Sequence, residues 1–172
     1  MSNFTFPYFG DLDINNLENY YDLDIDLDGI EIQIDIHFNE KSIDIEKASV
    51  IKNFISNVSV YSIQNKILIE QLYHNKTKRA VRKYIKYHLT DLNEAEFFKL
   101  SKIVDLDDKN TIPEIQLLKK IKLTRIGLFP HGKFEEKYFA EFDYIIDQQF
   151  IDTILVLQTD DDNNLHHVTM FG

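Results

Sequence analysis

Acidic side chains alternate with apolar ones near the start of the chain. Asp22, Asp24 and Asp26 occupy every second position, and the same spacing resumes after an Asp-Gly pair. Carboxylates gathered on one surface create a negative potential that attracts Lys and Arg side chains or metal cations. The candidate residues for binding a basic partner are therefore Asp22, Asp24, Asp26, Glu31 and Asp35.

Residues 24–35 also match part of the pattern of a calcium-binding loop. They offer acidic residues at loop positions 1, 3 and 5, a glycine at position 6 and Asp35 at position 12. Such a loop bends around its ion between two helices and takes two oxygens from a glutamate at position 12. Both flanks here alternate with period two, which is typical of strands. We expect no metal site in this segment, and a looser cation site on the carboxylate surface is the alternative.

A second set of polar residues lies in the more apolar C-terminal third. Arg125 and Asp143 fall in segments that we expect to be strands. If these strands pair, a structural ion pair is a more common outcome than a catalytic one. Together with Tyr144 and His167, these residues are the candidates of an alternative hypothesis, an enzyme of unrecognised type with a cleft on the C-terminal strands.

Other signatures of catalysis and cofactor binding are absent from the sequence. There is no cysteine, which excludes disulfides, thiolate metal sites and thiol nucleophiles. The six histidines show no zinc-binding spacing, and the five glycines form neither G-x-x-x-x-G-K-S/T nor G-x-G-x-x-G. The sequence therefore predicts no catalytic residue, no metal and no cofactor.

The acidic alternation predicts a β-hairpin. Residues 21–27 and 30–38 alternate apolar and polar side chains, and Asp28-Gly29 between them favours a two-residue type I′ turn. With this turn, the polar side chains oppose one another as Asp26 with Glu31, Asp24 with Gln33, and Asp22 with Asp35. Opposed like charges are unfavourable by a few tenths of a kcal/mol up to about 1 kcal/mol per pair, so this face is not optimised for stability.

The centre of the chain changes to helical spacing, and period two returns near its end. Apolar residues recur at helical spacing in the ranges 42–57, 59–74, 77–89, 93–103 and 112–120. Strands are predicted for 123–129, 137–146, 150–159 and 165–171. The order of elements predicts an α+β fold with a largely antiparallel sheet, built from an N-terminal hairpin and a C-terminal meander, with the helical central segment packed on one face.

Length and composition predict a single globular domain over residues 1–172. The apolar fraction of 44% fills one core, and no window approaches the roughly 18 consecutive apolar residues of a membrane span. The N-terminus has neither the basic nor the apolar region of a secretory signal. We therefore expect a cytoplasmic protein that does not bind a membrane.

The net charge of −10 is concentrated at the N-terminus. Residues 1–40 hold ten acidic residues and no Lys or Arg, and the remaining 19 acidic residues equal the 19 basic ones. Six of these basic residues lie within 76–88, a segment without acidic residues. Because the molecule is acidic and carries no nucleic-acid-binding motif, we interpret this segment as a solvated helix face and expect no nucleic-acid partner.

Five motifs stand out at the two ends of the chain. They are F-G-D-L-D at 9–13, Y-Y-D-L-D-I-D-L-D-G-I-E-I-Q-I-D-I-H-F at 20–38, R-I-G-L-F-P at 125–130, F-D-Y-I-I at 142–146 and L-H-H-V-T-M at 165–170. Together they resemble a bacterial family described as domain of unknown function 2004. This resemblance brings no catalytic residue with it. It implies a small bacterial cytoplasmic protein, similar in size, acidity and α+β composition to the immunity proteins that neutralise toxins.

These observations favour a non-enzymatic binding protein. The first hypothesis is an immunity protein whose acidic hairpin face docks a basic partner, such as a nuclease-type toxin. The alternatives are the enzyme with a cleft on the C-terminal strands and a structural or oligomeric protein without a dedicated site.

Overall fold

The acidic alternating segments form the first two strands of the main sheet, β3 (Tyr20–Leu27) and β4 (Ile30–His37). The structure is a computed structural model that describes residues 2–90, 92–133, 137–150 and 152–172. Asp28 and Gly29 form the turn, with φ angles of 55° and 85°. A type I′ turn requires positive φ at both central residues. The predicted register is confirmed, because Asp26 lies opposite Glu31 and Asp22 lies opposite Asp35.

A short hairpin that the sequence analysis did not predict precedes this one. Its strands are β1 (Asn3–Phe6) and β2 (Gly10–Asp13), which pair with each other and not with the main sheet. Two backbone hydrogen bonds connect the following loop to the segment before the first helix. They join Ile43 N to Ile14 O at 2.9 Å and Leu17 N to Lys41 O at 2.7 Å. These bonds fix the loop after β2 to the segment that leads into α1, and β1 itself contacts α1.

The predicted helical centre is confirmed. It contains α1 (Ile45–Ser56), α2 (Val58–His74), α3 (Ala80–Tyr87), α4 (Glu94–Ser101) and α5 (Pro113–Lys120). Local signals set several of the helix starts. The Asp44 side chain accepts a hydrogen bond from Lys47 N at 2.7 Å, Asn93 and Glu96 form a capping box, and Pro113 begins α5.

Four further strands complete the main sheet: β5 (Lys122–Leu128), β6 (Ala140–Ile145), β7 (Ile154–Thr159) and β8 (Leu165–Phe171). A 3-10 turn, η1 (Gln148–Phe150), follows β6, and β7 begins at Ile154, four residues later than the predicted start at residue 150. The strand order is β3-β4-β5-β6-β7-β8. All neighbours are antiparallel except β4 and β5, which run parallel. The helical segment provides the long crossover that a parallel pair requires.

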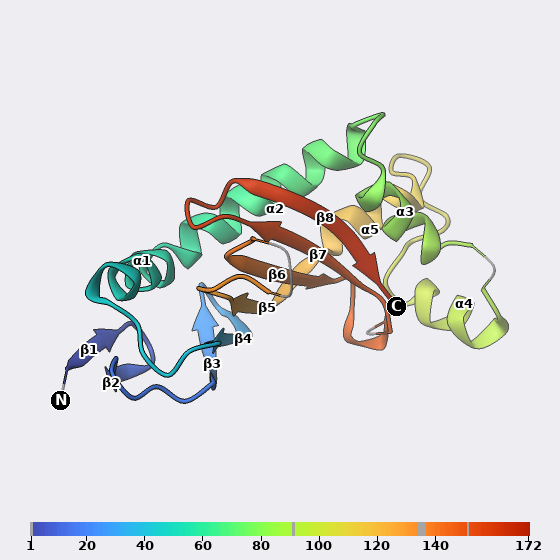
Figure 1. Cartoon of the computed structure of the whole chain (residues 1–172). Helices are drawn as coiled ribbons and strands as arrows, with labels where there is room; N and C mark the ends of the chain where they lie inside the picture. Colours follow the sequence, from blue (N-terminus) through green and yellow to red (C-terminus); the bar gives the residue numbers. More distant parts are fainter. Residues whose placement is uncertain (1, 91, 134–136, 151) are drawn as a thin grey trace.

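The helical segment packs on one face of the main sheet, as Figure 1 shows for α2 and α5. Phe54 of α1 packs against Phe142 of β6, with ring centroids 6.2 Å apart. A single cluster of buried apolar side chains extends from Phe6 to Val168 and includes residues of both hairpins. The α+β fold with a largely antiparallel sheet and helices on one face is therefore confirmed. Among the described residues, no helix is long and apolar enough to cross a membrane.

We call the face of the main sheet opposite the helices the open face. Successive residues of a strand point to opposite faces, so the polar residues that alternate with the core residues lie here. The charged and amide residues of its first four strands are Asp22, Asp24 and Asp26 of β3, Glu31, Gln33 and Asp35 of β4, Arg125 of β5, and Glu141 and Asp143 of β6.

Candidate functional site

Four of the five predicted binding carboxylates are exposed on the β3–β4 hairpin. These residues, Asp22, Asp24, Asp26 and Glu31, are called the acidic surface here. Two of them accept hydrogen bonds from the hairpin itself: Gln33 Nε2 donates to Asp22 Oδ2 at 3.3 Å, and Gly29 N donates to Asp26 Oδ1 at 2.9 Å. Within the described residues, no Lys, Arg or His forms an ion pair with any of the four. Their charges therefore face the solvent.

The prediction that Asp35 belongs to this exposed face is wrong. The Asp35 side chain has 0% exposure and binds the Arg125 guanidinium with both oxygens, at 2.6 Å to Nε and 2.8 Å to Nη2. His37 Nε2 lies 2.7 Å from the same carboxylate. The reason is that β5 pairs with β4 and places Gly127 beside Asp35. The part of β4 that contains Asp35 is therefore inside the sheet, between β3 and β5, and not at its edge.

The predicted ion pair between Arg125 and Asp143 is present. Arg125 Nη1 lies 2.9 Å from Asp143 Oδ2, and the two residues face each other on β5 and β6. Burial alone would lower the pKa of Arg125, but the charges and hydrogen bonds of Asp35 and Asp143 raise it. Burial raises the pKa of Asp143, and the nearby Arg125 offsets only part of that increase. Arg125 thus stays positively charged between two carboxyl groups.

Glu141 extends this network toward the loop between β5 and β6. Its carboxylate accepts hydrogen bonds from Tyr138 Oη at 2.6 Å, Lys133 Nζ at 3.1 Å and Gln158 Nε2 at 3.2 Å. Burial raises the pKa of Glu141, but these donors lower it further, so the net direction is downward. The charged groups at the centre of the open face, Asp35, Arg125, Glu141 and Asp143, are occupied by hydrogen bonds and ion pairs within the chain, which is typical of a structural network.

Gly127 makes room for this arrangement. A Cβ atom at position 127 would lie 2.4 Å from Arg125 Nη2 and 2.9 Å from Arg125 Cζ. Real Cβ atoms do not approach other atoms so closely. The guanidinium therefore reaches Asp35 by lying across the backbone of Gly127, and the sequence Arg125-Ile126-Gly127 is suited to that path.

The second predicted set of residues does not meet in a cleft. Arg125 and Asp143 are in contact, but Tyr144 follows Asp143 in β6 and points to the helix-covered face, where burial raises its pKa. His167 is exposed on β8, opposite Gln158. Three strand spacings separate β8 from β5, roughly 14 Å. The alternation of β6 and the order of the strands therefore contradict a shared active site of these four residues.

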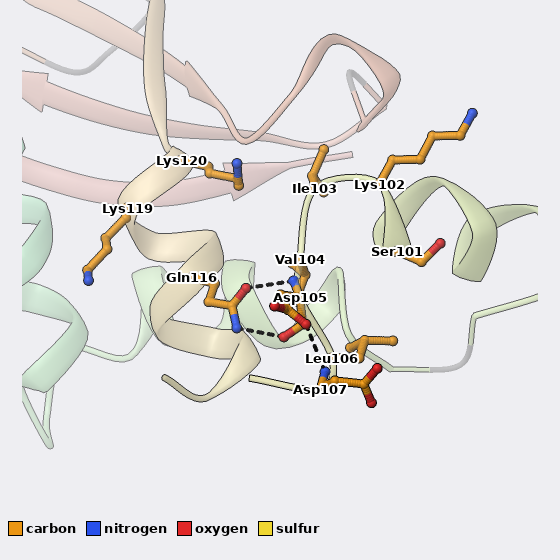
Figure 2. Close-up of a pocket in the computed structure, with 10 residues that line it drawn as sticks. All are labelled: Ser101, Lys102, Ile103, Val104, Asp105, Leu106, Asp107, Gln116, Lys119 and Lys120. Carbon is orange, nitrogen blue, oxygen red and sulfur yellow. Dashed lines mark hydrogen bonds between the residues drawn. The ribbon is translucent and has the colours of Figure 1, made fainter. Parts of the chain in front are cut away.

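A pocket in the helical part of the chain also lacks a convergent set of reactive groups. It is a pocket of about 840 Å³ between α5 and the loop after α4, drawn in Figure 2. Gln116 holds that loop with two hydrogen bonds of 2.8 Å to the backbone of Asp105, and Asp105 accepts one of 3.0 Å from Asp107 N. Lys102, Lys119 and Lys120 point in different directions (Figure 2). Gln116 and Asp105 therefore stabilise the loop, and the side chains around the pocket do not converge on a position where a ligand could bind.

The described residues contain no group of three or more His, Asp or Glu side chains that could hold a metal ion.

Comparisons of the chain with family models, curated proteins and solved structures gave no match. The bacterial family proposed from the five sequence motifs therefore stays a prediction. The acidic surface is the candidate functional site, because its charged groups are accessible and are not neutralised by described residues of the chain.

The opposition of Asp26 and Glu31 leads to a stability prediction. The variant Glu31→Lys replaces a repulsive cross-strand pair with an attractive one and should raise the free energy of unfolding by about 0.5–1 kcal/mol at low salt. Urea denaturation measures this change. Glu31→Gln should give a smaller increase, and both gains should shrink in 1 M NaCl, where the Debye length is about 3 Å. Equal stability of wild type and Glu31→Lys at low salt would contradict the repulsion.

Proposed function

We propose that this protein is a non-enzymatic binding protein of the cytoplasm, an immunity protein that neutralises a basic toxin through its acidic surface. The observation that carries the proposal is the exposure of Asp22, Asp24, Asp26 and Glu31 on a well-formed hairpin, with no cation of the described chain bound to them. A basic protein surface supplies the missing counter-charges.

The spacing of the acidic surface supports a protein partner. Alternate residues of a strand lie about 6.6–6.8 Å apart, so the three β3 carboxylates form a row of about 13 Å. This spacing is shorter than the Debye length of about 8 Å at physiological ionic strength, so neighbouring carboxylates reinforce one another's potential. Such a row suits a partner surface that carries several Lys and Arg side chains, such as the phosphate-binding surface of a nuclease.

The position of β3 at the sheet edge indicates that the partner is not a second copy of this chain bound strand to strand. An edge strand offers unpaired backbone groups to other strands, and charged side chains discourage that pairing. Two β3 strands placed side by side would bring their aspartates together, which is unfavourable. A strand or surface rich in Lys and Arg removes this repulsion, so the acidic surface selects for basic partners.

The mechanism that we propose is occlusion. The carboxylates pair with the cations that the toxin uses for phosphate, and the hairpin blocks access to them. The toxin then cannot hold its nucleic-acid substrate. Long-range attraction between the two charged surfaces also accelerates their association, which suits an inhibitor that must act before the toxin does.

The proposal is tested with the wild-type protein and the triple variant Asp22→Asn, Asp24→Asn, Asp26→Asn as affinity baits in the native cell. We expect wild type to retain a basic toxin, which is then purified for binding and nuclease-inhibition measurements. The triple variant should bind it at least tenfold more weakly, because each lost charge pair at an interface costs about 0.5–1 kcal/mol or more. Binding of wild type should also weaken steeply toward 1 M NaCl.

A matched control removes the same charge from another part of the molecule. The variant Glu94→Gln, Asp105→Asn, Asp107→Asn changes exposed residues of α4 and the following loop, which lie away from β3 in Figure 1. It should bind and inhibit like wild type. Equal loss of binding in both triple variants would show a general effect of net charge and contradict the assignment to the acidic surface. Unchanged binding in the β3 variant would also overturn the proposal.

A further inference from the structure

The two edge strands of the main sheet differ in charge. β3 carries Asp22, Asp24 and Asp26 at alternate positions, whereas β8 at the other edge contains no Asp, Glu, Lys, Arg or Pro. Charged side chains and proline are common means by which an edge strand avoids pairing with another chain. The seven residues of β8 therefore lack a protection that β3 has.

The backbone of β8 has hydrogen-bonding groups on its outer side. An edge strand of an antiparallel sheet points the N–H and C=O groups of every second residue away from its neighbour. Besides its pairing with β7, β8 forms no backbone hydrogen bond with any described residue. The closest helix, α3, contributes Val81, Tyr84 and Ile85 to the buried core and so belongs to the helical layer on the face of the sheet. The outer groups of β8 are thus a template for a further strand.

A bulge limits the part of β8 that a further strand can pair with. The ladder between β7 and β8 shifts register at Gln158 and Thr159, so that His166 is an extra residue. Such a bulge disrupts regular pairing locally and bends the strand. The regular segment is therefore 167–171, with Thr169 at its centre.

The side chains of this segment suit contact with a second copy of the same segment. In an antiparallel pair with its twofold axis at Thr169, His167 faces Phe171 of the second copy, and Val168 faces Met170. The Phe171 ring, which is 55% exposed in the single chain, gains an aromatic neighbour. Val168 and Met170 belong to the helix-covered side, where they extend the buried core across the join. The pairing opposes no two Asp, Glu, Lys or Arg side chains.

Charges near the two ends of β8 favour the antiparallel arrangement. The turn before β8 carries the exposed residues Asp161 and Asp162, which form no ion pair with any described residue. At the other end, α3 carries the exposed residues Lys83 and Lys86 and ends beside the segment that leads into β7, whose start pairs with the end of β8 (Figure 1). Antiparallel pairing brings the acidic end of one copy toward the basic end of the other, twice in the dimer.

The excess negative charge of the chain lies far from this join. Five strand spacings separate β3 from β8, about 24 Å, which exceeds the Debye length of about 8 Å at physiological ionic strength. In a dimer joined at β8, the two acidic surfaces lie at the opposite outer edges of the combined sheet. Their mutual repulsion is therefore screened.

We propose that two copies of this chain associate through β8, antiparallel about Thr169, and form one continuous sheet. The backbone groups of the two edge strands bond to each other, and the helical layers of both copies lie on the same face of the sheet. The dimer does not depend on the proposed toxin binding, and it leaves both acidic surfaces accessible.

Sedimentation velocity of the full chain tests this association. We expect the mass to rise from the 20.4 kDa of one chain toward twice that value between about 1 µM and about 1 mM protein, the range of modest affinities. Thr169→Asp places two carboxylates opposite each other on the axis and should weaken the dimer by about fivefold or more. Ser49→Asp adds the same charge at an exposed position of α1 and should dimerise like wild type. A wild type that stays monomeric throughout, or equal dimerisation of the two variants, would overturn the proposal.

A cysteine cross-link tests the register without adding charge. Because the chain contains no cysteine, Thr169→Cys introduces a single thiol that faces its counterpart across the axis. Opposed side chains of paired strands have Cβ atoms about 4.5–5.5 Å apart, close to the distance that a disulfide spans. Under mild oxidation we expect a covalent dimer to form about tenfold faster than with Ser49→Cys, although position 49 is the more exposed. Equal rates for the two variants would contradict pairing about Thr169.

Discussion

Replacement of Arg125 by Met should lower the free energy of unfolding by about 3–5 kcal/mol, because it leaves two buried carboxyl groups without their cation. The Asp35 side chain is completely buried, and that of Asp143 is nearly so, whereas Arg125 covers both and is itself 24% exposed. Urea denaturation at pH 7 measures the loss. The acidic surface does not include these residues, so any effect on partner binding should follow stability alone.

Two control variants separate the charge effect from the loss of a long side chain. Arg79→Met makes the same substitution at an exposed position and should change stability by no more than about 0.5 kcal/mol. The triple variant Arg125→Met, Asp35→Asn, Asp143→Asn removes the unpaired charges together with the arginine and should recover part of the lost stability. If the triple variant is less stable than Arg125→Met alone, unpaired charge is not the cause of the effect.

Protonation of His88 should make the protein less stable as the pH falls from about 6.5 to about 4. The folded state holds the ring neutral, with a pKa of about 4, whereas the unfolded chain binds a proton near the ordinary pKa of 6.5. Below pH 6.5 the unfolded state therefore binds more protons, and the free energy of unfolding decreases. A difference of this size corresponds to about 3 kcal/mol across the interval.

The measurement compares urea denaturation of wild type and His88→Phe at a series of pH values between 7.5 and 4.5. Carboxyl groups titrate in both proteins, so the difference between the two curves isolates His88. His74→Gln, at an exposed histidine, should retain the wild-type pH dependence. If His88→Phe loses stability with falling pH as steeply as wild type, the buried neutral ring is not responsible.

The sequence predicts those parts of the fold that depend on local signals. Asp28-Gly29 determines the turn, and the turn determines which residues of β3 and β4 face each other. The like-charge pairs could therefore be predicted from the sequence of the hairpin alone. The β1–β2 hairpin escaped prediction because each strand has only four residues, too few for a clear alternation. The turn between these two strands includes Tyr8, whose positive φ of 66° is uncommon for a residue other than glycine. The residue type therefore gave no sign of a turn at this position.

The burial of Asp35 could not be predicted from local sequence patterns. Its alternation with apolar neighbours equals that of Asp24, but Asp24 lies on an edge strand and Asp35 on an inner one. Only the parallel pairing of β4 with β5 brings Arg125 to Asp35, across 90 residues of chain. Arg125 is the residue that could have indicated a second buried carboxylate. A cation in an apolar strand requires more hydrogen-bond acceptors than Asp143 alone provides.

Gly127 gives this central network an unusual dependence on a position that carries no functional group. Any side chain there displaces the guanidinium that now lies over it, so even an alanine would disturb the bond to Asp35 without touching either ionic partner. Position 127 therefore tolerates fewer substitutions than expected for a residue that has no side chain and makes no ionic contact. In the divergence of this chain, the arginine and the glycine are expected to be retained or lost as one unit.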